Sequence, residues 1–133
     1  AALYRQPSIK ALVTLTRGEG FGLPILEAAA SGLPIIATDW SAHTEFLRKG
    51  RFLEVDYKLE EIHSSRVDNN IFMEGAKWAQ PKEEDAKQRL LKFRKSPFIP
   101  KKWATDLREK LLVEYSQSSI EKIYNDSLGH LFD

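Results

Sequence analysis

The feature that most constrains the fold is a glycine-rich stretch at residues 18–22, where three of five residues are glycine. Such a stretch continues neither a strand nor a helix cheaply, so it predicts a loop. Before it, residues 11–16 (ALVTLT) predict a short buried strand. After it, Pro24 suits the first turn of a helix over residues 25–31, and residues 34–38 (PIIAT) predict a second buried strand. This order is a βαβ unit, whose right-handed crossover joins parallel strands.

The pattern continues for one more helix and one more strand. Residues 42–48 predict a short helix, which Gly50 is placed to end. Residues 51–55 (RFLEV) predict a third strand, at the edge of the sheet. We therefore expect residues 1–55 to form the trailing part of a doubly wound α/β domain with about three parallel strands. Residues 56–80 lose the periodicity and contain several turn-forming residues, so we expect a loop or an insertion there.

The last segment, residues 81–133, predicts helices of the same domain. Pro81 is placed to open the first, with acidic residues at its start and basic residues at its end, which complements the helix dipole. Residues 103–115 repeat leucines at helical spacing and predict a second helix. Ser118, with Glu121 three residues later, predicts a capping box at the start of a third.

Composition excludes several classes of protein. The formal net charge is +1, so composition offers no electrostatic argument for binding nucleic acid, and we expect no nucleic-acid partner. The chain has no cysteine, which rules out disulfides and fits a reducing compartment. No apolar run approaches the roughly 20 residues that span a bilayer, and the first residues do not resemble a signal peptide. These features favour a cytoplasmic location.

The glycine-rich loop is suited to holding an anion. Successive N–H groups point into such a loop, and the N-terminus of the following helix adds partial positive charge. The amides of Phe21, Gly22 and Leu23 are therefore placed to donate to a diphosphate or to sugar hydroxyls. The loop matches neither the P-loop nor the dinucleotide-binding glycine pattern. The alternative is a tight turn that only leads into a helix.

Glu27 strengthens the functional interpretation. It stands eight residues after Glu19, about one turn into the expected helix, and its neighbours are apolar. A carboxylate in such surroundings needs a partner, and the paired hydroxyls of a ribose would serve. The alternative is an ordinary solvated glutamate on a helix.

Residues 18–38 (GEGFGLPILEAAASGLPIIAT) closely resemble the signature of retaining GT-B glycosyltransferases of the family 4-like, or group 1, type. Glu19 and Glu27 match the two acids of that family's E-x7-E motif. Residues 41–47 (SAHTEFL) resemble a later segment that ends near a third acid, although Ala42 stands where relatives often carry glycine. The resemblance implies the C-terminal, nucleotide-sugar-binding domain of an enzyme with two domains.

The resemblance also implies a role for each matching residue. Glu19 is expected beside the transferred sugar, as the catalytic residue of this chain. Glu27 is expected to bind the ribose, and Glu45 to lie near the edge of the nucleotide, with a plain surface role as its alternative. The remaining donor-binding residues belong to the loop: Arg17, Gly20, Phe21, Gly22 and Leu23.

The implied reaction is transfer of a hexosyl unit, with retention, from a nucleotide diphosphate sugar to a glycan, lipid or protein acceptor. The resemblance implies no cofactor, and the sequence has no Asp-x-Asp motif, in agreement with a metal-independent reaction. We expect the acceptor-binding N-terminal domain, the basic residues that clamp the diphosphate and any peripheral membrane contact to lie outside this chain, which would be inactive alone. The alternative is a non-catalytic, truncated module used for binding or assembly.

Two further features stay open. Residues 56–80, with Arg66, Phe72 and Trp78, are either a lid or acceptor-facing insertion, or a surface excursion packed on the helices. Trp40 either lines the site of the base or simply packs.

Overall fold

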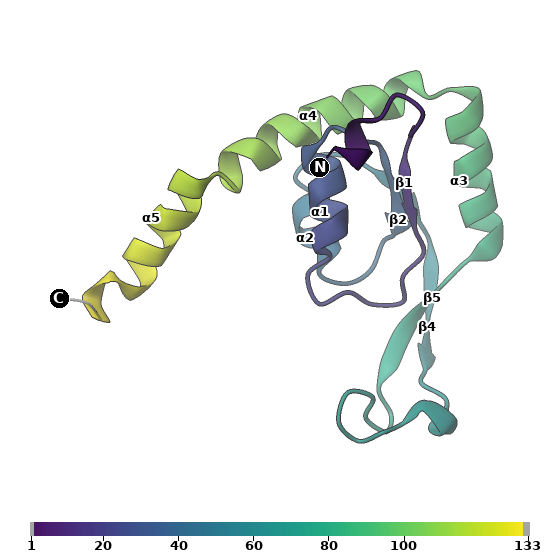
Figure 1. The fold of residues 1–133 in the computed structure, drawn as a ribbon. Coiled ribbons are helices and arrows are strands. Elements are labelled where there is room, and N and C mark those ends of the chain that lie inside the picture. The colour runs from purple at the N-terminus through teal and green to yellow at the C-terminus, as the bar shows by residue number, and fades with distance from the viewer. Residues whose placement is uncertain (1, 132–133) are drawn as a thin grey trace.

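The computed structural model describes residues 2–131 and has an α/β fold with a three-stranded parallel sheet (Figure 1). The strands are β1 (Leu12–Thr14), β2 (Ile35–Thr38) and β3 (Leu53–Val55), in the order β1-β2-β3. Both pairs are parallel, with Val13 opposite Ile36 and Ala37 opposite Glu54. The predicted fold class is confirmed, and all three predicted strands form. The prediction that the first strand is buried was wrong, because β1 lies at an edge of the sheet and its Val13 is 44% exposed.

Two helices connect these strands. Helix α1 (Leu23–Ala30) joins β1 to β2, with Pro24 in its first turn as predicted. Helix α2 (His43–Leu47) joins β2 to β3. A short helix thus leads from β1 to β2 and another from β2 to β3. Because the three strands are parallel, their carboxyl ends share one edge of the sheet.

Strand β2 divides the core in two because all four of its residues are buried. Alternate side chains of a strand point to opposite faces. Ile35 and Ala37 pack in a cluster with residues of α1, α2 and the long helix α4. Ile36 packs in a second cluster with β3 and α3. Helices therefore cover both faces of the sheet, as a doubly wound fold requires.

The segment expected to be a loop or an insertion, residues 56–80, contains most of an antiparallel hairpin. Strand β4 (Tyr57–Glu61) pairs with β5 (Lys77–Pro81), with Leu59 opposite Ala79. In Figure 1 the hairpin extends from the carboxyl edge of the sheet, at the bottom of the view. The sequence did not indicate these two strands because β4 carries mostly charged, exposed residues and neither strand shows a clear apolar alternation.

The hairpin leads directly into helix α3 (Glu83–Lys95). The prediction that Pro81 opens this helix was wrong. Pro81 is the last residue of β5, an edge strand, where its missing N–H is tolerated. Lys82 is the N-cap. The acidic first turn and the basic last turn are present as predicted.

Helix α4 (Phe98–Glu114) begins five residues earlier than predicted. Pro97 is its N-cap and Pro100 lies in its first turn, where a missing N–H costs nothing. Helix α5 (Gln117–Leu128) is capped by Ser116, whose Oγ accepts from the N–H of Ser119 at 3.2 Å, and not by Ser118 as predicted. Short 3₁₀ turns complete the described part of the chain at Leu3–Arg5, Ser64–Arg66 and Gly129–Leu131.

Gly50 is needed for packing against α4. Gly50 was predicted to end α2, but the C-cap of that helix is Arg48. A Cβ at position 50 would lie 2.9 Å from Cβ of Leu107 and 3.2 Å from its Cα. Leu107 is fully buried in the cluster that joins α1, α2 and α4.

We predict that Gly50→Ala destabilises the fold by about 1–3 kcal/mol, because the added methyl group forces α4 away from the sheet. Gly129→Ala is the matched control, since a Cβ there meets no atom within 4 Å, and we expect a change below about 0.5 kcal/mol. Urea denaturation followed by circular dichroism measures both. Equal stabilities of the two variants would contradict this account of the packing.

Candidate functional site

The glycine-rich loop connects the carboxyl end of β1 to α1, at the edge of the sheet where open α/β folds bind ligands. Gly22 is the N-cap of α1 and is left-handed, with φ 85° and ψ 45°. A Cβ at this position would lie 3.0 Å from Cβ of His43 and 3.2 Å from Cδ1 of Ile25. Both the backbone angle and the space therefore require glycine, and α1 starts in contact with α2.

The start of α1 presents N–H groups that no protein group uses. The N–H groups of Ile25 and Leu26 donate to the carbonyl oxygen of Gly22 at 2.9 and 3.0 Å. Across residues 2–131, those of Phe21, Gly22 and Leu23 donate to no protein acceptor. Because the helix dipole adds partial positive charge here, the arrangement is suited to an anion.

Ser41 fixes the main chain of Glu19. Its Oγ donates to the carbonyl oxygen of Glu19 and accepts from the N–H of Glu19, both at 2.8 Å. Ser41 has φ 88°, a left-handed backbone that is uncommon for serine. Sequence reasoning missed this residue, because its partner is 22 positions away and no local pattern connects them.

The side chain of His43 packs against the loop at Gly22. It is fully buried, and its Nε2 lies 2.7 Å from the carbonyl oxygen of Thr38. Since a carbonyl only accepts, Nε2 donates its hydrogen to this oxygen. Nδ1 of His43 and Oγ1 of Thr38 are buried without a partner among the described residues. The imidazole therefore acts as a packing support for Gly22.

A groove of about 730 Å³ lies between the loop and the hairpin. The loop side contributes residues on and around Glu19: Thr16, Arg17, Gly18, Glu19 and Gly20. Trp40 and Ser41 follow β2, and the hairpin supplies the opposite wall, which includes Ile62, Ile71, Phe72, Lys77 and Trp78. The groove is therefore formed by the βαβ unit together with the hairpin, for which the sequence predicted no strands.

The hairpin holds Arg17 in this groove. The guanidinium of Arg17 lies 4.4 Å from the ring centroid of Trp78, and the Trp78 ring meets that of Phe72 edge-on at 6.1 Å. The N–H of Ala79 donates to the carbonyl oxygen of Arg17 at 3.0 Å. One cation of the groove is thus stacked on an aromatic ring and tied by its backbone to β5.

The predicted residues do not all meet in the groove. Arg17, Glu19 and Gly20 line it. Phe21 lies outside and packs against the buried ring of Phe46, with the centroids 5.7 Å apart. Leu23 is exposed in the first turn of α1.

The two other predicted acids also lie outside the lining of the groove. Glu27 is exposed on α1, and Glu45 is exposed in the first turn of α2. Trp40 packs its ring against that of Tyr57, with the centroids 5.3 Å apart and the rings tilted by 48°, and it also lines the groove.

The tip of the hairpin is held by one carboxylate. An oxygen of Asp68 accepts from the N–H groups of Asn70, Ile71 and Phe72, each at 2.9 Å. These hydrogen bonds hold the pKa of the Asp68 carboxyl below its usual value of 3.8. Because Ile71 and Phe72 line the groove, Asp68 shapes one of its walls.

The described residues 2–131 contain no group of three or more His, Asp or Glu side chains placed to hold a metal ion. They also contain no helix whose length and apolar character would let it cross a membrane.

A parallel α/β sheet with a glycine-rich loop before a helix, at the carboxyl ends of its strands, defines a class of ligand-binding domains. Residues 1–64 match the model of a family described as glycosyl transferases group 1. The match supports a place in the glycosyltransferase superfamily and a role in glycosyl transfer. It ends inside the hairpin, between β4 and β5. No curated protein and no solved structure gives a significant match.

We predict that Ser41→Ala destabilises the protein by about 1–3 kcal/mol, because the N–H and the carbonyl of Glu19 lose their partner in a part-buried site. Ser41→Gly removes the same hydrogen bonds but relieves the left-handed backbone, so it should cost about 1 kcal/mol less. Urea denaturation of both variants is the measurement. A more stable alanine variant would show that the hydroxyl contributes nothing to the loop.

Lowering the pH should loosen the hairpin tip. A carboxyl whose folded-state pKa is lowered stabilises the fold fully above its unfolded value, here 3.8, and this stabilisation is lost as the pH falls through the folded-state pKa. Asp68→Asn should loosen the tip already at neutral pH. Hydrogen exchange at Asn70, Ile71 and Phe72 measures the change, and unaltered protection in Asp68→Asn would disprove this role of the carboxylate.

Proposed function

We propose that this chain provides the donor site of a retaining GT-B glycosyltransferase, which moves a hexosyl unit from a nucleotide diphosphate sugar to a glycan, lipid or protein acceptor. One observation carries the proposal: the unused N–H groups of Phe21, Gly22 and Leu23 follow directly in the chain on Glu19 and Gly20, which line the groove. These N–H groups and Glu19 lie in the segment that matches the glycosyltransferase model.

The loop suits the leaving group of such a reaction. As the glycosidic bond breaks, negative charge grows on the nucleoside diphosphate. Fixed amides and a helix N-terminus stabilise that charge without having to reorganise. Arg17, held over Trp78, adds a full positive charge in the groove that Glu19 lines. This supports transfer without a metal ion.

The two motif glutamates have different surroundings and, in the proposal, different roles. Glu19 lies in the groove with its main chain fixed by Ser41, which suits a carboxylate that contacts the reacting sugar. Glu27 is exposed one turn into α1, which suits a carboxylate that accepts from ribose hydroxyls. Glu45, exposed on α2, is assigned to the outer edge of the nucleotide.

The hairpin wall is assigned to the acceptor side of the groove. It projects beyond the carboxyl edge of the sheet (Figure 1). Phe72 and Trp78 are among the residues that line the groove from this side. Aromatic side chains provide rigid apolar faces in ligand sites, and a sugar ring presents such a face. Most of this wall lies beyond residue 64, where the family match ends.

Because the proposal requires an acceptor-binding domain beside this chain, it is tested in a protein that carries both. We expect Glu27→Gln to weaken donor binding about 10- to 100-fold, since a charged hydrogen bond is lost. We expect Glu19→Gln to lower kcat about 100-fold or more with a smaller change in donor affinity. Titration calorimetry with UDP, GDP and ADP and their glucose and mannose conjugates measures affinity, and glycosyl release measures turnover.

Glu121→Gln, on α5, is the control for charge loss and should change neither quantity. If no diphosphate binds, the donor site is refuted. If the donors bind but Glu19→Gln leaves turnover unchanged, the role of Glu19 is refuted and the donor site stands. Binding without any turnover in the unmodified protein would favour a non-catalytic module.

A further inference from the structure

The charge of the chain is distributed unevenly. Residues 86–105 contain seven Lys and Arg and no Asp or Glu. The remainder therefore has 13 cationic and 19 acidic residues, a net charge of −6 in a chain of net charge +1. Because charge acts over about 10 Å or less in salt solution, this local excess decides what the surface attracts.

The basic segment forms the corner between α3 and α4, which we call the elbow and define as residues 92–103. In Figure 1 it lies at the top right, at the end of the molecule away from the hairpin. Two of the seven basic residues precede it and form ion pairs: Lys87 with Glu83 and Glu84, and Arg89 with Asp85. The other five are exposed and form no ion pair within residues 2–131: Lys92, Arg94, Lys95, Lys101 and Lys102.

Apolar side chains project from the same corner. Phe98 is 77% exposed and Ile99 is 52% exposed, both in the first turn of α4. Phe98 lies three and four residues before Lys101 and Lys102, so the three share one face of the helix. Pro97 and Pro100 restrict the backbone on either side of this apolar pair.

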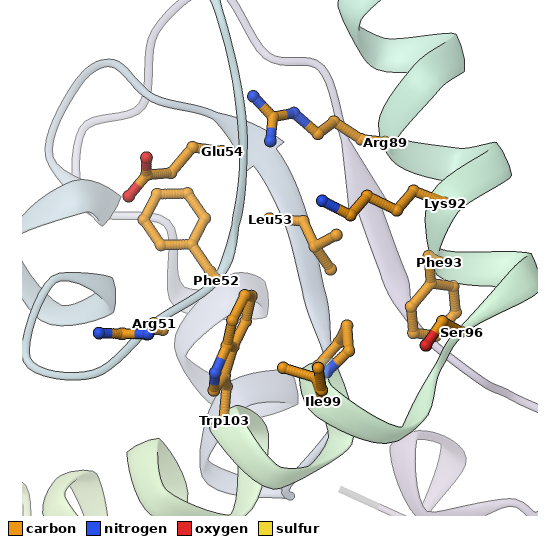
Figure 2. A pocket seen from close by; sticks show the side chains of 11 residues that line it. Arg51, Phe52, Leu53, Glu54, Arg89, Lys92, Phe93, Ser96, Ile99 and Trp103 are labelled. Carbon is orange, nitrogen blue, oxygen red and sulfur yellow. The ribbon is translucent and has the colours of Figure 1, made fainter.

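Two cavities beside the elbow are also lined by both basic and apolar side chains. One, of about 420 Å³, lies between β3, α3 and α4 (Figure 2). Arg89 and Lys92 extend across it from α3, and Trp103 rises from α4 at its other end. The second cavity continues past Phe98 and Lys102 and shares Ile99 and Trp103 with the first.

We propose that the elbow is a docking surface for a bilayer that contains anionic phospholipids. In this arrangement Phe98 and Ile99 enter the interface between headgroups and acyl chains, and the five unpaired cations contact lipid phosphates and carboxylates. The combination of exposed apolar tips with flanking cations is what an interfacial lipid surface recognises. Nucleic acid would account for the cations but not for two apolar side chains held at the tip.

The test is sedimentation of the protein with vesicles of equal parts phosphatidylserine and phosphatidylcholine, and with vesicles of phosphatidylcholine alone. We expect binding to the anionic vesicles only, weakened by salt. The K101Q/K102Q double variant should lower the affinity about 30-fold, since each cation near an anionic surface contributes about fivefold. The F98S/I99S double variant should lower it about 10-fold or more.

The control pair is V113S/K122Q, which removes an exposed apolar group and a lysine far from the elbow and should leave binding unchanged. A gain-of-signal measurement complements these losses. The chain has no cysteine, so an environment-sensitive dye on I99C should shift to the blue with anionic vesicles, whereas the dye on K122C should not.

Absence of binding to anionic vesicles overturns the proposal, as does binding that neither double variant weakens or a dye on I99C that does not respond. Tighter binding to duplex DNA or single-stranded RNA, unchanged in F98S/I99S, would assign the cations to nucleic acid instead. None of these outcomes depends on donor binding, so the two proposals fail separately.

Discussion

The contact between Gly22 and His43 determines the geometry of the loop. A residue with a side chain at position 22 would meet Cβ of His43 at 3.0 Å, so α1 begins where it does only because glycine is there. His43 is held in turn by its hydrogen bond to Thr38 at the end of β2. The position of the unused N–H groups at the start of α1 is therefore fixed to the sheet through the buried side chain of His43.

The sheet can position the loop so firmly because β2 is buried on both faces. Ile35 and Ala37 point to the face that packs on α1, α2 and α4, and Ile36 points to the face that packs on α3. A ligand group at the carboxyl ends of these strands lies beside β2, all of whose residues are buried. The hairpin, by contrast, is tied to this frame by a few contacts such as the one from Ala79 to Arg17. The groove thus has one rigid wall and one wall of lower local stability.

The sequence predicted what depends on neighbouring residues and missed what depends on distant ones. The three parallel strands, α1 and the loop have strong local signals, namely β-branched runs, clustered glycines and a proline. The β4–β5 hairpin has none, because its pairing joins residues about 20 positions apart and its strands are mostly polar. For the site, Glu19 and Arg17 were predicted to bind ligand and do line the groove. The contributions of Ser41 and Trp78 arise only from tertiary contacts, and no local rule signals them.

Net charge was equally misleading, because a value of +1 averages an acidic body and a basic elbow. The placement of the two surfaces links the two proposals. The groove lies at the carboxyl ends of β1 and β2, whereas the elbow adjoins Arg51 and Phe52, at the amino end of β3. In a parallel sheet these are opposite ends, as the positions of hairpin and elbow in Figure 1 show. A molecule docked on lipid by its elbow would hold the groove on the side away from the bilayer. That orientation favours an acceptor that arrives from water, such as a glycan or a protein, over one still embedded in the same membrane.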